Sequence, residues 1–325
     1  MSTLNRPALK QTAAQRLEAA AYDPHRLILL HTGVVVALTL VLSAINYILQ
    51  LQISDAGGLS GLGTRTVLST IQMLLQLGQL LLLPFWQFGL IYAALRIYRR
   101  EEATPDTLLG GFRRFGPLLR LMGLEMALGM GIGFVCSYLA SFLFLITPWG
   151  REMFSAVAAM GSEVTEMMIM ETMMAYSVPL MVIFLLVFLA VCIPFFFRLR
   201  LAPYILLDTP CKSALLAMQA SRQLLRGRCL ELLKLDLSFW WFYALDLLVT
   251  LVAYSDTILQ LLGVQLSADP AVIYFGVLVL YSLCQLALYW KFRAPVEVTY
   301  AAAYDQLSQP QQAQEAQPQN QPWTY

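Results

Sequence analysis

The stretch RLRLAPYILLDTPCKSALLAMQASRQLLRGRCLELLKLDLSFWWFYALD, from Arg198 to Asp246, decides the fold. It leaves one long apolar segment, continues as a basic amphipathic stretch with polar breaks, and enters a second apolar segment that carries Asp236 and Asp246. Long apolar segments joined by a short basic connection are typical of a protein that crosses a membrane several times.

The composition of the whole chain agrees with this interpretation. Of the 325 residues, 58% are hydrophobic and 13% are charged, against about 45–50% and about 25% in soluble domains. A soluble fold of this size could not bury so much apolar surface. The net charge of +1 gives no general attraction to nucleic acid, and we expect no nucleic-acid partner.

Six segments are long and apolar enough to span a membrane, which takes about 20 residues. They predict an all-α polytopic membrane protein: a six-helix transmembrane bundle with amphipathic cytoplasmic connecting helices. We expect a cytoplasmic N-terminal segment 1–26, a six-span domain 27–307, and a disordered Gln/Pro-rich cytoplasmic tail 308–325. The predicted spans are 27–49, 67–95, 117–146, 177–197, 230–254 and 271–292.

Lys and Arg residues are concentrated in alternate connections. All of the 21 except Arg65 and Arg151 lie in the N-terminal segment, in the connections 96–120 and 198–234, or after the last span. Basic connections stay on the cytoplasmic side of a membrane. The distribution therefore predicts that both termini are cytoplasmic, which an even number of spans permits.

Two of the basic connections resemble each other. The first reads TPDTLLGGFRRFGPLLRLMGLE from Thr104, and the second reads TPCKSALLAMQASRQLLRGRCLELLKLD from Thr209. Each opens with Thr-Pro, in which Thr caps a helix and Pro is its first residue. Either the two connections form an internal repeat, or two membrane-associated basic segments resemble each other by chance.

Three acids lie near or within the predicted spans: Asp246, Asp236 and Glu125. A charge at the bilayer centre costs about 2.5–3.5 kcal/mol, so each needs a partner or water. Asp246 lies about ten residues beyond Asp236, near mid-membrane at a rise of about 1.5 Å per residue, and is a candidate for a proton or cation path. For Asp236 and Glu125 we favour ion pairs that hold the bundle together. The basic residues within reach are Lys234, Arg120 and Arg114.

The basic residues of the connections are candidate binding groups. Four to eight such residues on an amphipathic stretch attract anionic lipid, by about 1 kcal/mol for each residue near the surface. We expect contact with the lipid bilayer, and with anionic lipid or another membrane protein. The alternative is that these charges only fix the topology. The candidates are Arg222, Arg226, Arg228, Lys212, Arg113 and Arg114.

The connection 149–176 is rich in Met and Glu. Thioethers are ligands for Cu(I), and Met168, Met170 and Met173 are closely spaced. Apolar residues at helical spacing from Met153 onward favour the alternative, an amphipathic helix on the outer membrane surface. The chain has no zinc or catalytic motif and no phosphate-binding loop. We therefore expect no metal site, no catalytic residue and no cofactor.

The string SRQLLRGRCLELLKLDLSFWWF, from Ser221 to Phe242, resembles the hallmark of an uncharacterised bacterial membrane-protein family, domain of unknown function 975. The later string APVEVTYAAAYDQL is similar to the closing pattern of that family, although Val296 stands where a Tyr often follows the Pro. The resemblance covers the last third specifically and the six-span layout generally. It implies a bacterial cytoplasmic membrane and an all-helical bundle, and it implies no activity and no functional residues.

Three functions remain open on the sequence. The first, which we favour because catalytic motifs are absent, is a non-catalytic scaffold, assembly or regulatory module that acts through its basic cytoplasmic loops. The second is a small transporter or export component with Asp246 in a polar path. The third is a membrane-embedded enzyme that acts on lipid. The polar residues that could serve the third are Arg198, Arg200, Asp208, Glu231 and Asp236.

Overall fold

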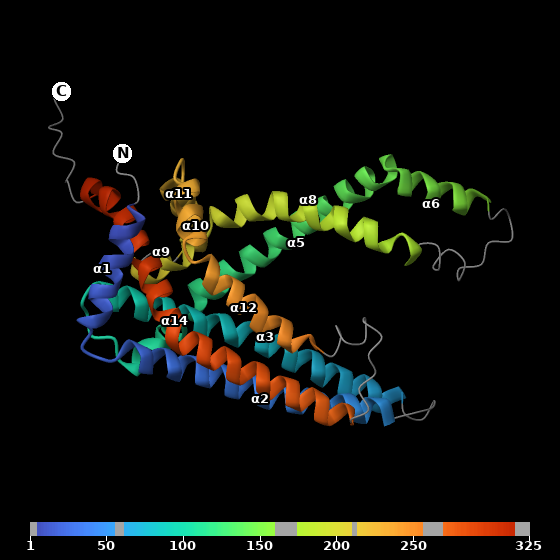
Figure 1. Ribbon diagram of the computed structural model, residues 1–325, viewed down its shortest axis with the longest axis horizontal. Helices are drawn as coiled ribbons and strands as arrows, with labels where there is room; N and C mark the ends of the chain where they lie inside the picture. Colours follow the sequence, from blue (N-terminus) through green and yellow to red (C-terminus); the bar gives the residue numbers. More distant parts are fainter. Residues whose placement is uncertain (1–4, 56–61, 160–173, 210–212, 256–268, 316–325) are drawn as a thin grey trace. The chain divides into compact units, whose positions relative to one another are not determined.

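The protein is helical in almost all of its described residues (Figure 1). No β-strand occurs among these residues, and the all-α prediction is confirmed. The computed structural model describes residues 5–55, 62–159, 174–209, 213–255 and 269–315.

The chain divides into two compact units. The first unit consists of Met1–Leu118, Pro203–Pro210 and Gly227–Tyr325. The second consists of Leu119–Ala202 and Cys211–Arg226.

The predicted spans correspond to long apolar helices. In the described part of the chain, five helices are long and apolar enough to cross a membrane, and a sixth span results if α11 (Cys229–Leu237) and α12 (Trp240–Ala253) are taken together. The protein is therefore polytopic, as predicted. The five single spans are Pro24–Ser54, Gly63–Tyr98, Phe115–Ile146, Ser177–Asp208 and Ala271–Ser308.

The predicted span 230–254 is not one straight helix. Helices α11 and α12 meet at an angle of 64°. At the bend, the Ser238 hydroxyl donates to the Leu235 carbonyl oxygen at 2.5 Å, and Lys10 Nζ donates to the Ser238 carbonyl oxygen at 2.9 Å. These groups compete for carbonyls that would otherwise continue the helix, which explains the bend.

Helix α14 (Pro270–Glu315) is central to the first unit. It packs against α1 (Arg6–Glu18), α2 (Pro24–Asp55), α3 (Leu62–Tyr98) and α12, and Figure 1 shows it running beside α2. Towards its end Ala301, Ala302 and Ala303 are fully buried. Such small side chains allow neighbouring helices to approach closely.

The last helix is longer than predicted. Helix α14 continues to Glu315 and so includes the beginning of the tail 308–325 that we expected to be disordered. Gln, Ala and Glu, which make up most of these residues, are good helix formers, and this explains the difference. Residues 316–325 of the tail lie outside the described residues.

The connection after α3 packs tightly onto that helix. It forms a 3₁₀ turn, η2 (Pro105–Leu109), and a short helix, α4 (Gly110–Arg113). Thr104 occupies the N-cap position before Pro105, as predicted, but its side chain makes no capping hydrogen bond. A Cβ on Gly89 of α3 would lie 1.8 Å from the Leu108 carbonyl oxygen, and one on Gly111 would lie 2.1 Å from the Phe85 carbonyl oxygen. Only glycine allows the two backbones to come this close.

The second unit contains α5 (Phe115–Ile146), α6 (Pro148–Ala159), α8 (Ser177–Phe197) and α10 (Ala214–Leu224). The hydroxyl of Ser221, fully buried in α10, donates to the Arg198 carbonyl oxygen at 2.8 Å and accepts from the Leu201 N–H at 3.2 Å. This serine therefore anchors α10 to the turn that follows α8.

Two predictions in the connections need correction or completion. Thr209 was expected to cap a helix, but its hydroxyl donates to the Ile205 carbonyl oxygen at 2.7 Å and so closes α9 (Ala202–Asp208), while Ser213 precedes α10. Helix α6 covers the first part of the predicted outer amphipathic helix. Residues 160–173, which include Met168, Met170 and Met173, lie outside the described residues.

Candidate functional site

One face of α14 carries a row of polar side chains that we call the polar stripe. Its members are three or four residues apart, a spacing that places them on the same side of a helix. Each makes a polar contact with another side chain. The polar stripe consists of Tyr289, Arg293, Glu297, Tyr300 and Tyr304.

Asp246, the deepest predicted acid, is bound by the first member of the polar stripe. The Tyr289 hydroxyl donates to Asp246 Oδ1 at 2.9 Å, and both side chains are half-buried. The predicted need for a partner is thus met by a neutral hydroxyl of α14. A charge-assisted hydrogen bond of this kind stabilises a carboxylate without a cation.

Asp236 has a similar partner further along α14. The Tyr300 hydroxyl donates to Asp236 Oδ1, and the Tyr243 hydroxyl oxygen lies 2.7 Å from that of Tyr300. Because Tyr300 gives its proton to the carboxylate, Tyr243 is the donor to Tyr300. Nearby, Lys10 Nζ lies 4.0 Å above the Phe239 ring, and burial, followed by the charge of Arg6, lowers the pKa of Lys10.

Asp208 is the third acid bound by α14, and it belongs to an ion-pair cluster that the sequence analysis did not identify. The Tyr304 hydroxyl donates to Asp208 Oδ2 at 3.0 Å. Arg99 donates to both oxygens of Asp208 and also to Asp305 Oδ1, at 2.9 Å from Nη2. The side chains of Asp208 and Asp305 are only 10% and 17% exposed. Their hydrogen bonds and charges, those of Asp208 first, raise the pKa of Arg99.

The middle of the polar stripe forms a closed group of three side chains. Arg293 Nε donates to Glu297 Oε1 at 3.2 Å, Gln87 Nε2 donates to the same oxygen at 3.3 Å, and Arg293 also donates to Gln87 Oε1. The Arg293 guanidinium lies 4.5 Å from the centre of the Tyr289 ring. This group ties α14 to α3 between the Asp246 and Asp236 contacts.

His31 of α2 is buried beside Trp86 of α3. Its Nε2 lies 3.2 Å from the Trp86 carbonyl oxygen, and Trp86 Nε1 donates to the His31 carbonyl oxygen at 3.1 Å. Within the described part of the protein, His31 Nδ1 and Thr32 Oγ1 are buried and have no hydrogen-bond partner. Buried polar atoms are usually paired, so these two need a partner that the described residues do not provide.

Glu125 behaves differently from the aspartates. It lies half-buried in α5, and no hydrogen bond or ion pair joins it to another described residue. The ion pair that we predicted for it is absent from this part of the chain. One expected partner, Arg114, instead donates to the carbonyl oxygens of Leu206 and Thr209. The distance between residues along the sequence could not show that the Arg114 guanidinium would bind these backbone carbonyl oxygens.

The candidate binding residues of the connections are mostly on the surface. Arg113, Arg222 and Arg226 are exposed, and Arg228 is half-buried. The Arg222 guanidinium lies 5.3 Å from the centre of the Phe195 ring. Lys212 lies outside the described residues. Among those that are described, no three His, Cys, Asp or Glu side chains come together as possible metal ligands.

Comparisons with known proteins identify a family but no characterised relative. The sequence model of the family described as "Protein of unknown function (DUF975)" matches residues 1–294. No curated protein and no solved structure matches the chain.

Proposed function

The chain belongs to the protein family of unknown function DUF975, and we propose that it is a non-catalytic scaffold, assembly or regulatory module of a bacterial cell membrane. The observation that carries the proposal is a contrast between acidic and basic side chains. Asp246, Asp236 and Asp208 each accept a tyrosine hydroxyl from α14, whereas Arg113 and Arg226 are exposed and form no ion pair with a described residue.

This contrast favours binding over chemistry. A carboxylate that is occupied by hydrogen bonds within the protein is poorly placed to transfer protons or to hold a metal. An exposed guanidinium offers five donors to a phosphate or carboxylate of a partner. In the third function considered above, an enzyme that acts on lipid, Asp208 and Asp236 would have to act, yet Arg99 and Tyr300 hold them.

The proposal includes an orientation and a class of partner. We place both termini and the basic connections in the cytoplasm because such connections are retained there. The cytoplasmic leaflet is anionic and attracts basic segments. The partner is therefore anionic lipid or a membrane protein with an acidic surface, and neither a cofactor nor a nucleic acid belongs to the proposal.

A photocrosslinking amino acid at the exposed position Gln223 of α10 tests this proposal in living cells. We expect a discrete protein or lipid adduct that disappears when Arg222, Arg226 and Arg228 are all changed to Gln. It should persist when the same three residues are changed to Lys, because the charge is retained. Arg151→Gln, in the connection that we place outside, is the matched control. Equal adduct yields from the Gln triple variant and the natural protein would refute the proposal.

A second candidate function, a small transporter, is favoured by one specific observation. His31 Nδ1 and Thr32 Oγ1 are buried and have no hydrogen-bond partner among the described residues, and they lie in the unit that also holds Asp246. Water at these atoms and at Asp246 would provide a polar path. The test places a cysteine at Asp246 in a background without the five native cysteines and applies a membrane-impermeant thiol reagent. Labelling of this cysteine, but not of one at the exposed apolar position Leu247, would favour transport. Protection of both would leave Asp246 as a structural acid.

A further inference from the structure

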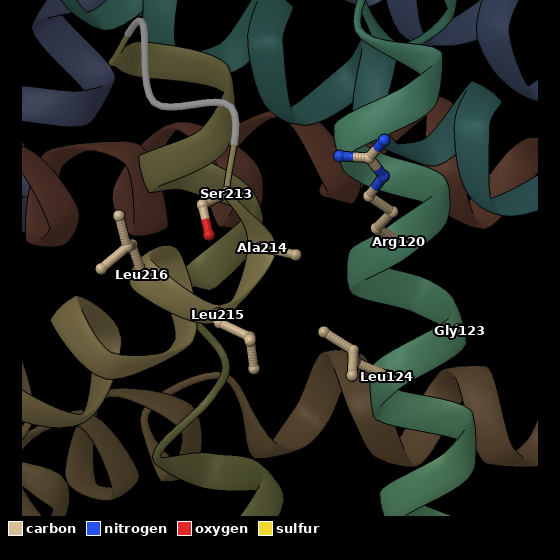
Figure 2. A pocket seen from close by; sticks show the side chains of 7 residues that line it. All are labelled: Arg120, Gly123, Leu124, Ser213, Ala214, Leu215 and Leu216. Atoms are coloured by element: carbon tan, nitrogen blue, oxygen red, sulfur yellow. The ribbon is translucent and has the colours of Figure 1, made fainter.

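A groove lies between α5 and the beginning of α10 in the second unit (Figure 2). Its volume is about 820 Å³, which is within the range of about 300–1,000 Å³ found for small-molecule sites. Helix α5 contributes Arg120, Gly123 and Leu124, and the start of α10 contributes Ser213, Ala214, Leu215 and Leu216.

The walls of the groove are apolar. Leu124 and Leu215 point towards each other across the gap in Figure 2, and Leu215 is 58% exposed. A Cβ on Gly123 would meet no atom within 4 Å, so the groove is open beside this residue. Helix α5 is one of the membrane-spanning helices, and an apolar groove along such a helix is filled favourably by a lipid chain.

Among the described residues that line the groove, Arg120 is the one that carries a charge. It is exposed, and no hydrogen bond or ion pair connects it to another described residue. It lies five residues after the start of α5, or about 8 Å along the helix, near the end of the span. The ends of a membrane-spanning helix lie near the lipid headgroups, and a guanidinium binds phosphate with two hydrogen bonds.

The charge of the groove selects between classes of lipid. None of the seven described residues that line it has a carboxylate that could attract the cationic group of a zwitterionic headgroup. The positive end of the α10 helix dipole at Ser213 adds to the attraction for an anion.

We propose that this groove binds an anionic phospholipid, with the phosphate on Arg120 and one acyl chain between Leu124 and Leu215. The inference deepens the proposed function, on which it rests for placing the groove at a membrane surface. Unlike the proposed function, it assigns a discrete lipid site to a residue other than Arg222, Arg226 and Arg228.

Photoactivatable lipids with a diazirine in the acyl chain test the site directly. The full chain is reconstituted into nanodiscs that contain either a phosphatidylglycerol or a phosphatidylcholine probe, and mass spectrometry locates the adducts. We expect phosphatidylglycerol adducts to concentrate on the peptides that contain Leu124 and Leu215. Arg120→Gln should reduce these adducts about five-fold, the effect of one basic residue near the surface, and should leave phosphatidylcholine labelling unchanged. Arg151→Gln, which changes an exposed arginine of α6 in the same unit but outside the groove, should have no effect on these adducts.

A second variant tests the groove itself. Gly123→Trp fills the space between the walls and should reduce labelling by both probes at these peptides. Gly131→Trp, at a position of α5 that is equally open, should not. The proposed site would be refuted if both lipids labelled these peptides equally and neither Arg120→Gln nor Gly123→Trp changed the labelling.

The result is separable from the test of the proposed function. If the lipid site fails while the Gln223 adduct still depends on the three arginines, the inference falls and the proposed function stands. If the lipid site holds while that adduct is insensitive to the arginines, the proposed function falls.

Discussion

Replacement of Arg99 should lower the stability of the fold strongly. It is the cation for Asp208 and Asp305, and Arg99→Leu would leave both carboxylates buried without it. We expect the free energy of unfolding to fall by about 3–5 kcal/mol, measured by SDS titration of the detergent-solubilised protein. Arg113→Leu, which removes an exposed arginine, should change it by less than about 0.5 kcal/mol.

The same cluster allows a stricter test. Changing Arg99, Asp208 and Asp305 to Leu together leaves no unpaired charge, and apolar replacement of a whole buried ion pair is often neutral. We therefore expect the triple variant to regain part of the stability that Arg99→Leu loses. The remaining loss comes from the buried Tyr304 hydroxyl, which no longer has Asp208 as its acceptor. A triple variant as unstable as Arg99→Leu would show that the fold needs the specific hydrogen bonds of the cluster.

Tyr300 of the polar stripe forms hydrogen bonds with two other side chains, Asp236 and Tyr243. Tyr300→Phe would remove the donor to Asp236 and the acceptor for Tyr243. Removing one partner of a hydrogen-bonded polar group costs about 1–3 kcal/mol. We expect a destabilisation at the lower end of this range in the same SDS titration, because Asp236 is only half-buried and Tyr243 is exposed. Tyr138→Phe, at a position that is 77% exposed, is the control. Equal stability of the two variants would mean that water replaces the Tyr300 hydroxyl.

At the scale of elements, the contact of η2 and α4 with α3 depends on glycine. Gly89→Ala would place a methyl group 1.8 Å from the Leu108 carbonyl oxygen, so the connection must move away from α3. We expect a lower melting temperature and faster proteolysis between residues 104 and 113. Gly78→Ala, in the same helix with open space around it, should be neutral or slightly stabilising, since Ala favours helix. Unchanged proteolysis in Gly89→Ala would contradict this close contact.

The elements also show what the sequence could and could not predict. Apolar length located five spans that are single helices and a sixth segment that is the bent pair α11 and α12, because a membrane-spanning helix is recognisable from its own residues. The partners of the acids were not predictable in this way. Tyr289, Tyr300 and Tyr304 are 43, 64 and 96 residues away from the aspartates that they bind. Helical spacing shows which residues share a face of α14, but it does not show which helix lies opposite that face.

At the scale of the whole molecule, the positions of the basic residues predict the orientation of the chain in the membrane. In a background without native cysteines, a cysteine at Arg113 should react with an impermeant thiol reagent only after the cells are permeabilised. A cysteine at Ser155, exposed in α6, should react in intact cells. The reverse pattern would invert the proposed topology, and with it the assignment of the basic connections to the anionic leaflet.

The contacts of α14 also restrict how this helix can move. Its 46 residues extend roughly 69 Å at the usual rise of an α-helix, about twice the hydrocarbon thickness of a bilayer. Turning the helix by one residue rotates it by about 100° and would withdraw the hydroxyls of Tyr289, Tyr300 and Tyr304 from their aspartates at the same time. A rotation by less than one residue would not restore any of these three hydrogen bonds. A rotation of α14 as a rigid body would therefore break the contact with Asp246 and the contact with Asp208, at opposite ends of the polar stripe, together.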